Sequence, residues 1–262
     1  PWGVGYPGWH IECSCISMKH LGDDLDIHCG GIDNAFPHHT NEIAQSESYL
    51  GHKWCNYWFH VHHLNTDNGK MSKSKGEFLT VSLLEQKGYD PMAYRLFCLQ
   101  SHYRRNLVFS WENLDNAVAA YDKLIAKIAT LKTEGDVEQE AFDKLKERFV
   151  NALNGDLNTS VAVTALYDVL KAKCNDTTKL ALIADFDKVL SLNLLAAAEK
   201  YNQKKTEEEA ASADPEIDAL VAARTAAKKE RNFAEADRIR DELKAKGIEI
   251  IDTPQGAKWR KV

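Results

Sequence analysis

Between Met92 and Asp214 the sequence contains no proline and only two glycines, Gly135 and Gly155. The stretch is rich in Ala, Leu, Lys and Glu, which are strong helix formers. Ser110 is a candidate N-cap for a helix over Trp111–Leu131, in which apolar residues recur at i, i+3, i+4 and i+7. Similar apolar spacing predicts three further helices, over Gln139–Leu153, Ser160–Lys173 and Thr178–Tyr201. The middle of the chain is therefore predicted to form an antiparallel helical bundle whose apolar residues are used in its own core.

The C-terminal part of the chain predicts a small α+β domain. Residues 202–213 are polar and low in apolar content, which is typical of a linker. Two helices and two strands are expected beyond it, over Glu216–Arg231, Phe233–Lys246, Ile248–Ile251 and Lys258–Val262.

This tail differs in charge from the rest of the chain. Residues 214–262 carry 11 basic and 10 acidic side chains, so the tail is close to +1 and the remainder close to −7. Arg224, Lys228 and Arg231 are expected on one helical face, and this spacing alone predicts a solvated charged face. The net charge of −6 argues against a protein that coats nucleic acid generally, but it leaves room for a local RNA-binding face.

The chemistry is expected in the first 110 residues. They hold all ten histidines, five of the six cysteines and ten of the fourteen glycines. No export signal and no apolar stretch of membrane-spanning length is visible, so these cysteines suggest metal or thiol chemistry in the reducing cytoplasm. Short strands at Asp26–His28 and Trp58–Asn65 and helices at Phe36–Leu50 and Pro91–Ser101 predict an α/β nucleotide-binding layer.

One spacing within this part suggests a metal site. His38 and Glu42 are four residues apart on a predicted helix that has Pro37 in its first turn, so they would share one face. Cys13 could add a thiolate, and a set of Cys, His and Glu suits zinc. A fourth ligand could be Cys15, water or a group outside this chain. On spacing alone, a surface His–Glu pair and a buried structural cysteine explain the pattern equally well.

A second pattern points to phosphate chemistry. Three lysines, two serines and a glycine lie within Lys70–Gly76, and such a loop can place ammonium groups on a polyphosphate. A generic loop of this composition would be a solvated linker. The ordered string KMSKS at Lys70–Ser74, however, is a signature of class I aminoacyl-tRNA synthetases.

Other strings resemble one family within that class, the cysteinyl-tRNA synthetases. These strings are Pro7–Ser14, His28–Asp33, Phe36–Glu47, Lys70–Ser74, His102–Arg104, Phe233–Arg240 and Gly256–Arg260. The resemblance covers essentially the whole chain. It implies that 1–110 form the C-terminal half of a class I Rossmann-type catalytic domain, 111–201 a helical bundle, 202–213 a linker and 214–262 an anticodon-binding-like tail.

The resemblance also implies a set of site residues. Cys13, His38 and Glu42 would hold a zinc ion that binds the thiolate of substrate cysteine, while Trp9 and His28 would line the amino-acid pocket. Cysteine and serine differ by one atom, and the shape of a pocket alone separates two such substrates by only ~1–3 kcal/mol. A thiophilic ion is therefore a sensible means of rejecting serine.

For ATP, which binds with Mg²⁺, the resemblance assigns Gly30, Gly31 and Asp33 to the adenosine side and Lys73 to the phosphates, with Lys70 as a second catalytic lysine. Cys29 departs from the family pattern, which usually has a third glycine there. The family's first Rossmann half and a further zinc cysteine would precede Pro1, so the chain is expected to begin inside the catalytic domain and to be inactive alone.

The function implied is ATP-dependent ligation of cysteine to its tRNA through cysteinyl-adenylate, by a cytoplasmic protein that we expect to be a monomer. Two alternatives remain open from the sequence. One is the related mycothiol-pathway ligase, which joins cysteine to an amino-sugar inositol. The other is a non-catalytic RNA-binding or zinc-binding module derived from a synthetase.

Overall fold

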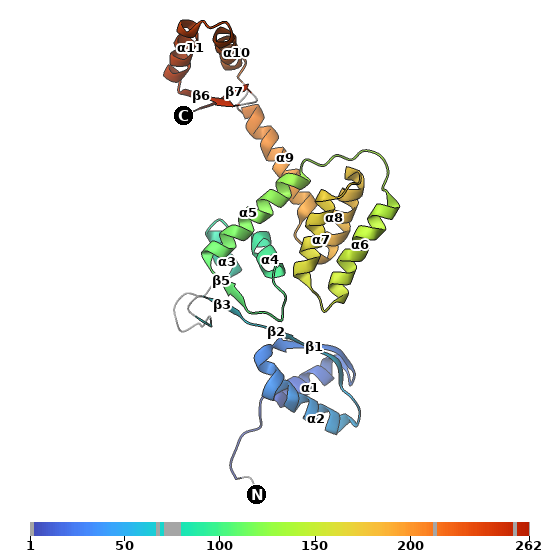
Figure 1. Cartoon of the computed structure of the whole chain (residues 1–262). Helices are drawn as coiled ribbons and strands as arrows, with labels where there is room; N and C mark the ends of the chain where they lie inside the picture. Colours follow the sequence, from blue (N-terminus) through green and yellow to red (C-terminus); the bar gives the residue numbers. More distant parts are fainter. Residues whose placement is uncertain (1–2, 67–68, 71–79, 212–213, 254–255, 262) are drawn as a thin grey trace. The chain divides into compact units, whose positions relative to one another are not determined.

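A computed structural model describes residues 3–66, 69–70, 80–211, 214–253 and 256–261 (Figure 1). The chain forms two compact units, Pro1–Leu195 and Ala196–Val262. Among the described residues, no helix is both long enough and apolar enough to cross a bilayer.

The first unit begins with a small α/β layer. Helix α1 (His10–Leu21) precedes strand β1 (Leu25–Gly31), which pairs in parallel with β2 (Cys55–Val61), and helix α2 (Thr40–Leu50) makes the crossover between the strands (Figure 1). Two short turns, Ile32–Asn34 and Ala35–His39, connect β1 to α2.

The core of this layer is built around Trp54, which is fully buried with Leu25 and Cys55. Met18 from α1 and Leu50 from α2 pack against the same cluster, so both helices lie against the sheet. Side chains alternate along a strand, and the face opposite His28 leaves Ile27 59 % and Tyr57 71 % exposed. The layer is thus covered on one face.

A second small sheet follows, in the order β4–β3–β5. It consists of β3 (Leu64–Thr66), β4 (Gly69–Lys70) and β5 (Leu107–Phe109), with helices α3 (Val81–Gln86) and α4 (Pro91–Leu99) between β4 and β5. The predicted single strand Trp58–Asn65 was therefore wrong. It divides at His62, whose amide donates to the carbonyl of Tyr103 at 2.9 Å instead of continuing the ladder with β1.

The predicted helical bundle is present. It contains α5 (Trp111–Ile128), α6 (Gln139–Asn154), α7 (Thr159–Lys171) and α8 (Asp176–Leu190). Ser110 is the N-cap of α5, as predicted, and its Oγ accepts from the amide of Asn113 at 3.1 Å. The core includes fully buried Leu166 and Leu182, and the rings of Phe149 and Phe186 stack 4.0 Å apart.

The predicted helix Thr178–Tyr201 is instead two helices. The carboxylate of Asp187 accepts from the amides of Leu192 and Leu194 at 2.6 and 2.8 Å, while Ser191 and Asn193 adopt positive φ. This local cap ends α8 and starts α9 (Leu194–Ala211) without a glycine or proline to mark the break. Residues 202–211, expected as a linker, are helical, because their Lys, Glu and Ala favour a polar helix as well as an open chain.

The second unit contains the predicted small α+β arrangement. Helices α10 (Pro215–Lys229) and α11 (Phe233–Ala245) precede the antiparallel hairpin of β6 (Ile248–Thr253) and β7 (Gly256–Lys261). Its core gathers Ile217, Val221, Ile239, Leu243 and Ile248.

The predicted solvated face in this unit was wrong at Arg224, whereas Lys228 and Arg231 are exposed as predicted. Arg224 is only 7 % exposed, and Arg231 lies beyond the end of α10 with φ +60°. Spacing along a helix cannot report which neighbouring element covers a side chain, nor that the helix ends two residues before its predicted end.

Candidate metal and substrate site

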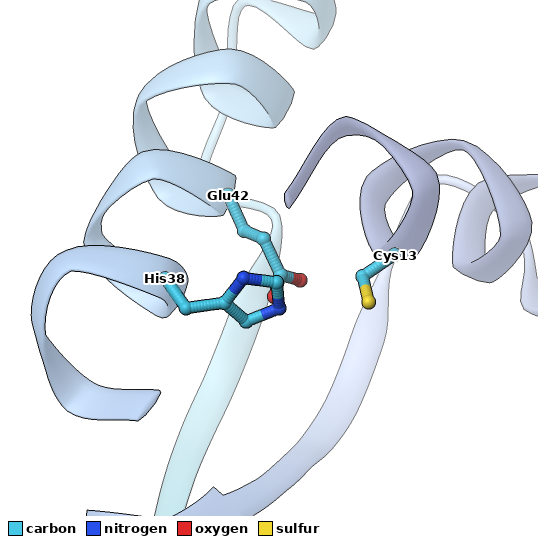
Figure 2. Close-up of side chains that lie close together, drawn as sticks. All are labelled: Cys13, His38 and Glu42. Atoms are coloured by element: carbon cyan, nitrogen blue, oxygen red, sulfur yellow. The ribbon is translucent and has the colours of Figure 1, made fainter. Parts of the chain in front are cut away.

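The structure brings Cys13, His38 and Glu42 together. Each offers one ligand atom, and these atoms all lie within 4.8 Å of one another. Figure 2 shows the His38 ring beside the Glu42 carboxylate, with Cys13 on the neighbouring helix α1. The convergence predicted from the spacing is therefore present in the fold.

In the His38–Glu42 pair, His38 lies in the turn Ala35–His39 that leads into α2, and Glu42 lies in the first turn of α2. Nε2 of His38 lies 2.8 Å from Oε1 of Glu42, as expected for residues four apart. The predicted start of the helix at Phe36 was wrong. Phe36 is extended, with φ −141° and ψ +133°, and α2 itself begins at Thr40 after the wider turn Ala35–His39.

Glu42 is the best evidence that this cluster suits a cation. Its side chain is fully buried, and Oε2 lies 2.9 Å from Nε2 of His28. Among the described residues, neither carboxylate oxygen has a partner in hydrogen-bonding geometry. Burial raises the pKa of Glu42, because a charged carboxylate without hydrogen bonds is costly away from water. A bound divalent ion would remove that cost, so the donor set fits zinc.

His39 and His60, two histidines that the sequence did not single out, lie close to this cluster. Nδ1 of His39 lies 2.8 Å from Nε2 of His60, and His28, His39 and Glu42 form a second group of atoms within 4.8 Å. Burial lowers the pKa of His39 to about 4 and also lowers the pKa of His28 and His60. These three rings therefore carry no positive charge near pH 7. The His38-His39 doublet was the only sign in the sequence that a second histidine lies near the site. The doublet does not tell which of the two rings faces β2.

The two predicted pocket residues both contact this cluster. Trp9 stacks on His38 with 3.7 Å between ring centroids, and its side chain remains 56 % exposed. His28 reaches Glu42 from β1 and lies 4.9 Å from the Trp58 ring, measured between ring centroids. Trp9 and His28 thus flank the candidate metal ligands from different elements.

The predicted adenosine-contacting residues lie at the carboxyl end of β1. A Cβ at Gly30 would stand 2.7 Å from Cε1 of His39, and one at Gly31 would stand 2.4 Å from Oδ1 of Asp33. Asp33 Oδ1 lies 3.4 Å from Nε2 of His63. Glycine is favoured at position 30, where the His39 ring approaches the backbone closely, whereas the exposed Asp33 side chain beside Gly31 is free to move aside. The carboxyl ends of parallel strands are also where α/β folds bind ligands.

Cys29, the departure from the family pattern, does not point toward the side chains of His39 and Asp33 that lie against Gly30 and Gly31. It pairs with Phe59 in the β1–β2 register, on the strand face opposite His28, and its side chain is exposed.

The two lysines assigned to phosphate chemistry cannot be compared with this geometry. The backbone of Lys70 pairs with Asn65 in the β3–β4 ladder. The side chain of Lys70 and the whole of Lys73 lie outside the described residues.

Comparison with known proteins first gives two protein-family models that match parts of the chain. The family model for the catalytic domain of class I (C) tRNA synthetases matches residues 1–119, and the model for the cysteinyl-tRNA ligase anticodon binding domain matches residues 210–260. The N-terminal part of the chain is thus similar to the catalytic domain of class I tRNA synthetases.

The individual proteins that are similar to the chain include several cysteine--tRNA ligases. Cysteine--tRNA ligases of Brevibacillus brevis and Symbiobacterium thermophilum are each 43 % identical to the chain, over 100 % of its length and 58 % of theirs. The cysteine--tRNA ligase of Novosphingobium aromaticivorans is also 43 % identical, over 99 % of the chain and 55 % of its own length. The chain is similar over 99–100 % of its length to these cysteine--tRNA ligases, and it spans a little more than half of their length.

Proposed function

We propose that the protein to which this chain belongs ligates cysteine to its tRNA, through cysteinyl-adenylate and at the expense of ATP. The observation that carries the proposal is the buried, unsatisfied carboxylate of Glu42 beside His38 and Cys13. A site that places a thiol, an imidazole and a carboxylate together suits a thiophilic ion. The full-length similarity to cysteine--tRNA ligases supplies the substrate class.

We assign Cys13, His38 and Glu42 as zinc ligands. Zinc bound there would supply a Lewis acid that takes the substrate thiolate and lowers the pKa of its thiol. The residues around the ligands set their orientation. Trp9 holds the plane of the His38 ring, and His28 contacts the Glu42 oxygen that His38 does not. Discrimination against serine would then depend on a bond that a hydroxyl makes poorly.

For the nucleotide, we propose that Gly30, Gly31 and Asp33 contact adenosine at the carboxyl end of β1. We assign the phosphates, with their Mg²⁺, to Lys73, aided by Lys70. Ammonium groups there would act on charge that develops during transfer. We further propose a cytoplasmic monomer whose residues 210–260 bind the anticodon of the cysteine tRNA. The match of this segment to an anticodon-binding model favours tRNA over an amino-sugar acceptor.

The metal and amino-acid parts of the proposal can be tested on the 262-residue chain itself. The chain is loaded with Co²⁺, which takes the place of zinc and reports sulfur ligands by thiolate-to-cobalt charge-transfer absorption. Cysteine should strengthen this absorption, whereas serine at equal concentration should leave it unchanged. Equal responses to the two amino acids would contradict the proposed role of the metal.

The ligation itself is tested in a fusion protein that also contains the part of a relative's sequence that this chain does not cover. The unmatched part of the Brevibacillus brevis ligase is fused to the chain, and the fusion is given ATP, cysteine and either tRNA or an amino-sugar acceptor. Cysteine should be transferred to tRNA alone. Transfer to the amino sugar would favour the related ligase instead, and no adenylate formation would favour a non-catalytic module.

A further inference from the structure

The turn between α6 and α7 is strained. Asp156 and Leu157 follow one another with φ of +64° and +51°. Positive φ is uncommon outside glycine, and it persists when the surrounding structure requires it. Gly155, which could adopt it freely, instead has φ −79°. The positive φ therefore falls on Asp156 and Leu157 although glycine stands next to them.

The strained conformation directs the Asp156 carboxylate at a segment far away in sequence. Its Oδ1 accepts from the hydroxyl of Tyr103 at 2.5 Å, and its Oδ2 accepts from Nε of Arg104 at 2.6 Å. Nη2 of Arg104 and Nε2 of His102 lie 3.4 and 3.9 Å from the carboxylate. Arg104 first, and then Tyr103, hold the pKa of Asp156 below its usual value.

Tyr103 in turn contacts the end of β2. Its carbonyl accepts from the amide of His62, and its ring stacks on Phe59 with 4.2 Å between centroids. The guanidinium of Arg104 also lies over the Tyr103 ring, 5.2 Å from the ring centroid. One carboxylate from the bundle thus holds a loop that closes over a strand of the α/β layer.

That strand end carries residues of the candidate site. His60 on β2 contacts His39, next to the candidate ligand His38, at 2.8 Å. His63, just beyond β2, lies 3.4 Å from Asp33, which we assign to adenosine. Two successive contacts therefore connect Asp156 to the end of β2, and a third connects that strand end to each half of the site.

We infer that Asp156 is a positioning residue for adenylation: through Tyr103 it fixes the carboxyl end of β2, and with it His60 and His63. The catalytic part of this inference rests on the proposed function, whereas the positional part rests on the contacts alone. A half-exposed Asp–Arg pair contributes little by itself. The small stability of this pair does not explain the strained turn. The direction in which the turn points the Asp156 carboxylate explains it better.

The first test measures position without activity. Asp156→Asn removes the charge but keeps the shape, and asparagine tolerates positive φ, so the variant should fold with an unchanged Tm. Hydrogen exchange at the His62 amide should become about tenfold faster, because its acceptor loop is no longer held. Asp168→Asn is the matched control. Asp168 pairs with Arg148 at 3.0 Å within the same bundle and should leave the exchange unchanged.

The second test measures function in the fusion described above. Asp156→Asn should lower kcat for ATP–pyrophosphate exchange about tenfold, with the KM for cysteine and the bound zinc unchanged. Tyr103→Phe keeps the ring but loses the hydroxyl and should have a similar effect. The double variant should be no slower than either single one, because both remove the same contact.

Three results would contradict the inference. The first is wild-type behaviour of Asp156→Asn in both tests. The second is a loss of Tm with proportional losses in every readout, which would show a merely structural role. The third is full additivity of the two substitutions. Absence of cysteine-dependent exchange in the unsubstituted fusion would instead overturn the proposed function, and hydrogen exchange at His62 would still decide the positional claim.

Discussion

The imidazole of His38 lies against the indole of Trp9, with 3.7 Å between centroids and 21° between the ring planes. Trp9 is the residue before α1, and Cys13 lies one turn further along that helix. The same short segment therefore supplies one candidate ligand and fixes the ring plane of another. This relationship makes Trp9 a supporting group of the metal site as well as a pocket residue.

Trp9→Ala should weaken zinc binding about tenfold, because residues that orient a metal ligand typically change affinity by that order. Trp9→Phe preserves a ring over His38 and should retain most of the affinity. Competition with a zinc-sensitive chelating dye measures both variants. Equal affinities for the alanine variant and the unsubstituted chain would show that the stack does not support the site.

Cys13→Ser should abolish stoichiometric zinc binding, since it removes the only sulfur in the candidate ligand group. Cys15→Ser is the matched control, because Cys15 lies two residues further along α1 and is exposed. Native mass spectrometry of the purified chains counts the bound ions. Zinc retained by the first variant and lost by the second would move the thiolate ligand from Cys13 to Cys15.

Gly30→Ala should destabilise the α/β layer by about 1–3 kcal/mol, the usual cost of forcing an extra carbon into a packed site. The added Cβ would stand 2.7 Å from the ring of His39, which is itself held by His60. Gly5→Ala meets nothing within 4 Å and should be neutral. Urea unfolding followed by tryptophan fluorescence compares them, and an unchanged midpoint for Gly30→Ala would show that His39 can move aside.

Lys73→Ala should lower both kcat and kcat/KM for ATP–pyrophosphate exchange in the fusion while leaving cysteine binding unchanged. A contact made to the phosphates only as charge develops lowers both constants together. Lys75→Ala, two residues away in the same lysine-rich segment, is the control and should have a much smaller effect. An unchanged exchange rate for Lys73→Ala would remove this lysine from the proposed mechanism.

Asp185→Asn should lower the Tm at pH 7 by roughly 2–4 °C, corresponding to at most about 1 kcal/mol. Hydrogen bonds from Lys146 and then Lys188 lower the pKa of Asp185 in the folded protein. A lowered carboxylate pKa stabilises the fold above the unfolded pKa of about 3.9, and this stabilisation disappears as the pH falls through the folded pKa. The two melting curves should therefore converge below about pH 4. Asp122→Asn, an exposed carboxylate on α5, should change the Tm little at any pH.

Local patterns predicted the parts of this structure that local physics determines. The cap at Ser110 and the apolar spacing after it placed α5, and the four-residue spacing placed His38 beside Glu42. The break after α8 was missed because Asp187 caps two amides across it with no breaker residue present. The pairing of His39 with His60 and the burial of Arg224 depend on which elements meet in three dimensions. No spacing within one segment contains that information.

The placement of the thiols has a practical consequence for anyone who purifies this chain. Cys15 and Cys29 are exposed, whereas Cys13 is partly covered, and burial raises the pKa of its thiol. The first products of air oxidation should therefore be disulfides between molecules through the two exposed sulfurs, while the candidate metal sulfur survives longer. A covalent dimer on a non-reducing gel would then show that the sample had been oxidised during storage, and it would not report the oligomeric state of the protein. Preparations kept reduced from lysis onward are the ones in which mass and metal content can be compared.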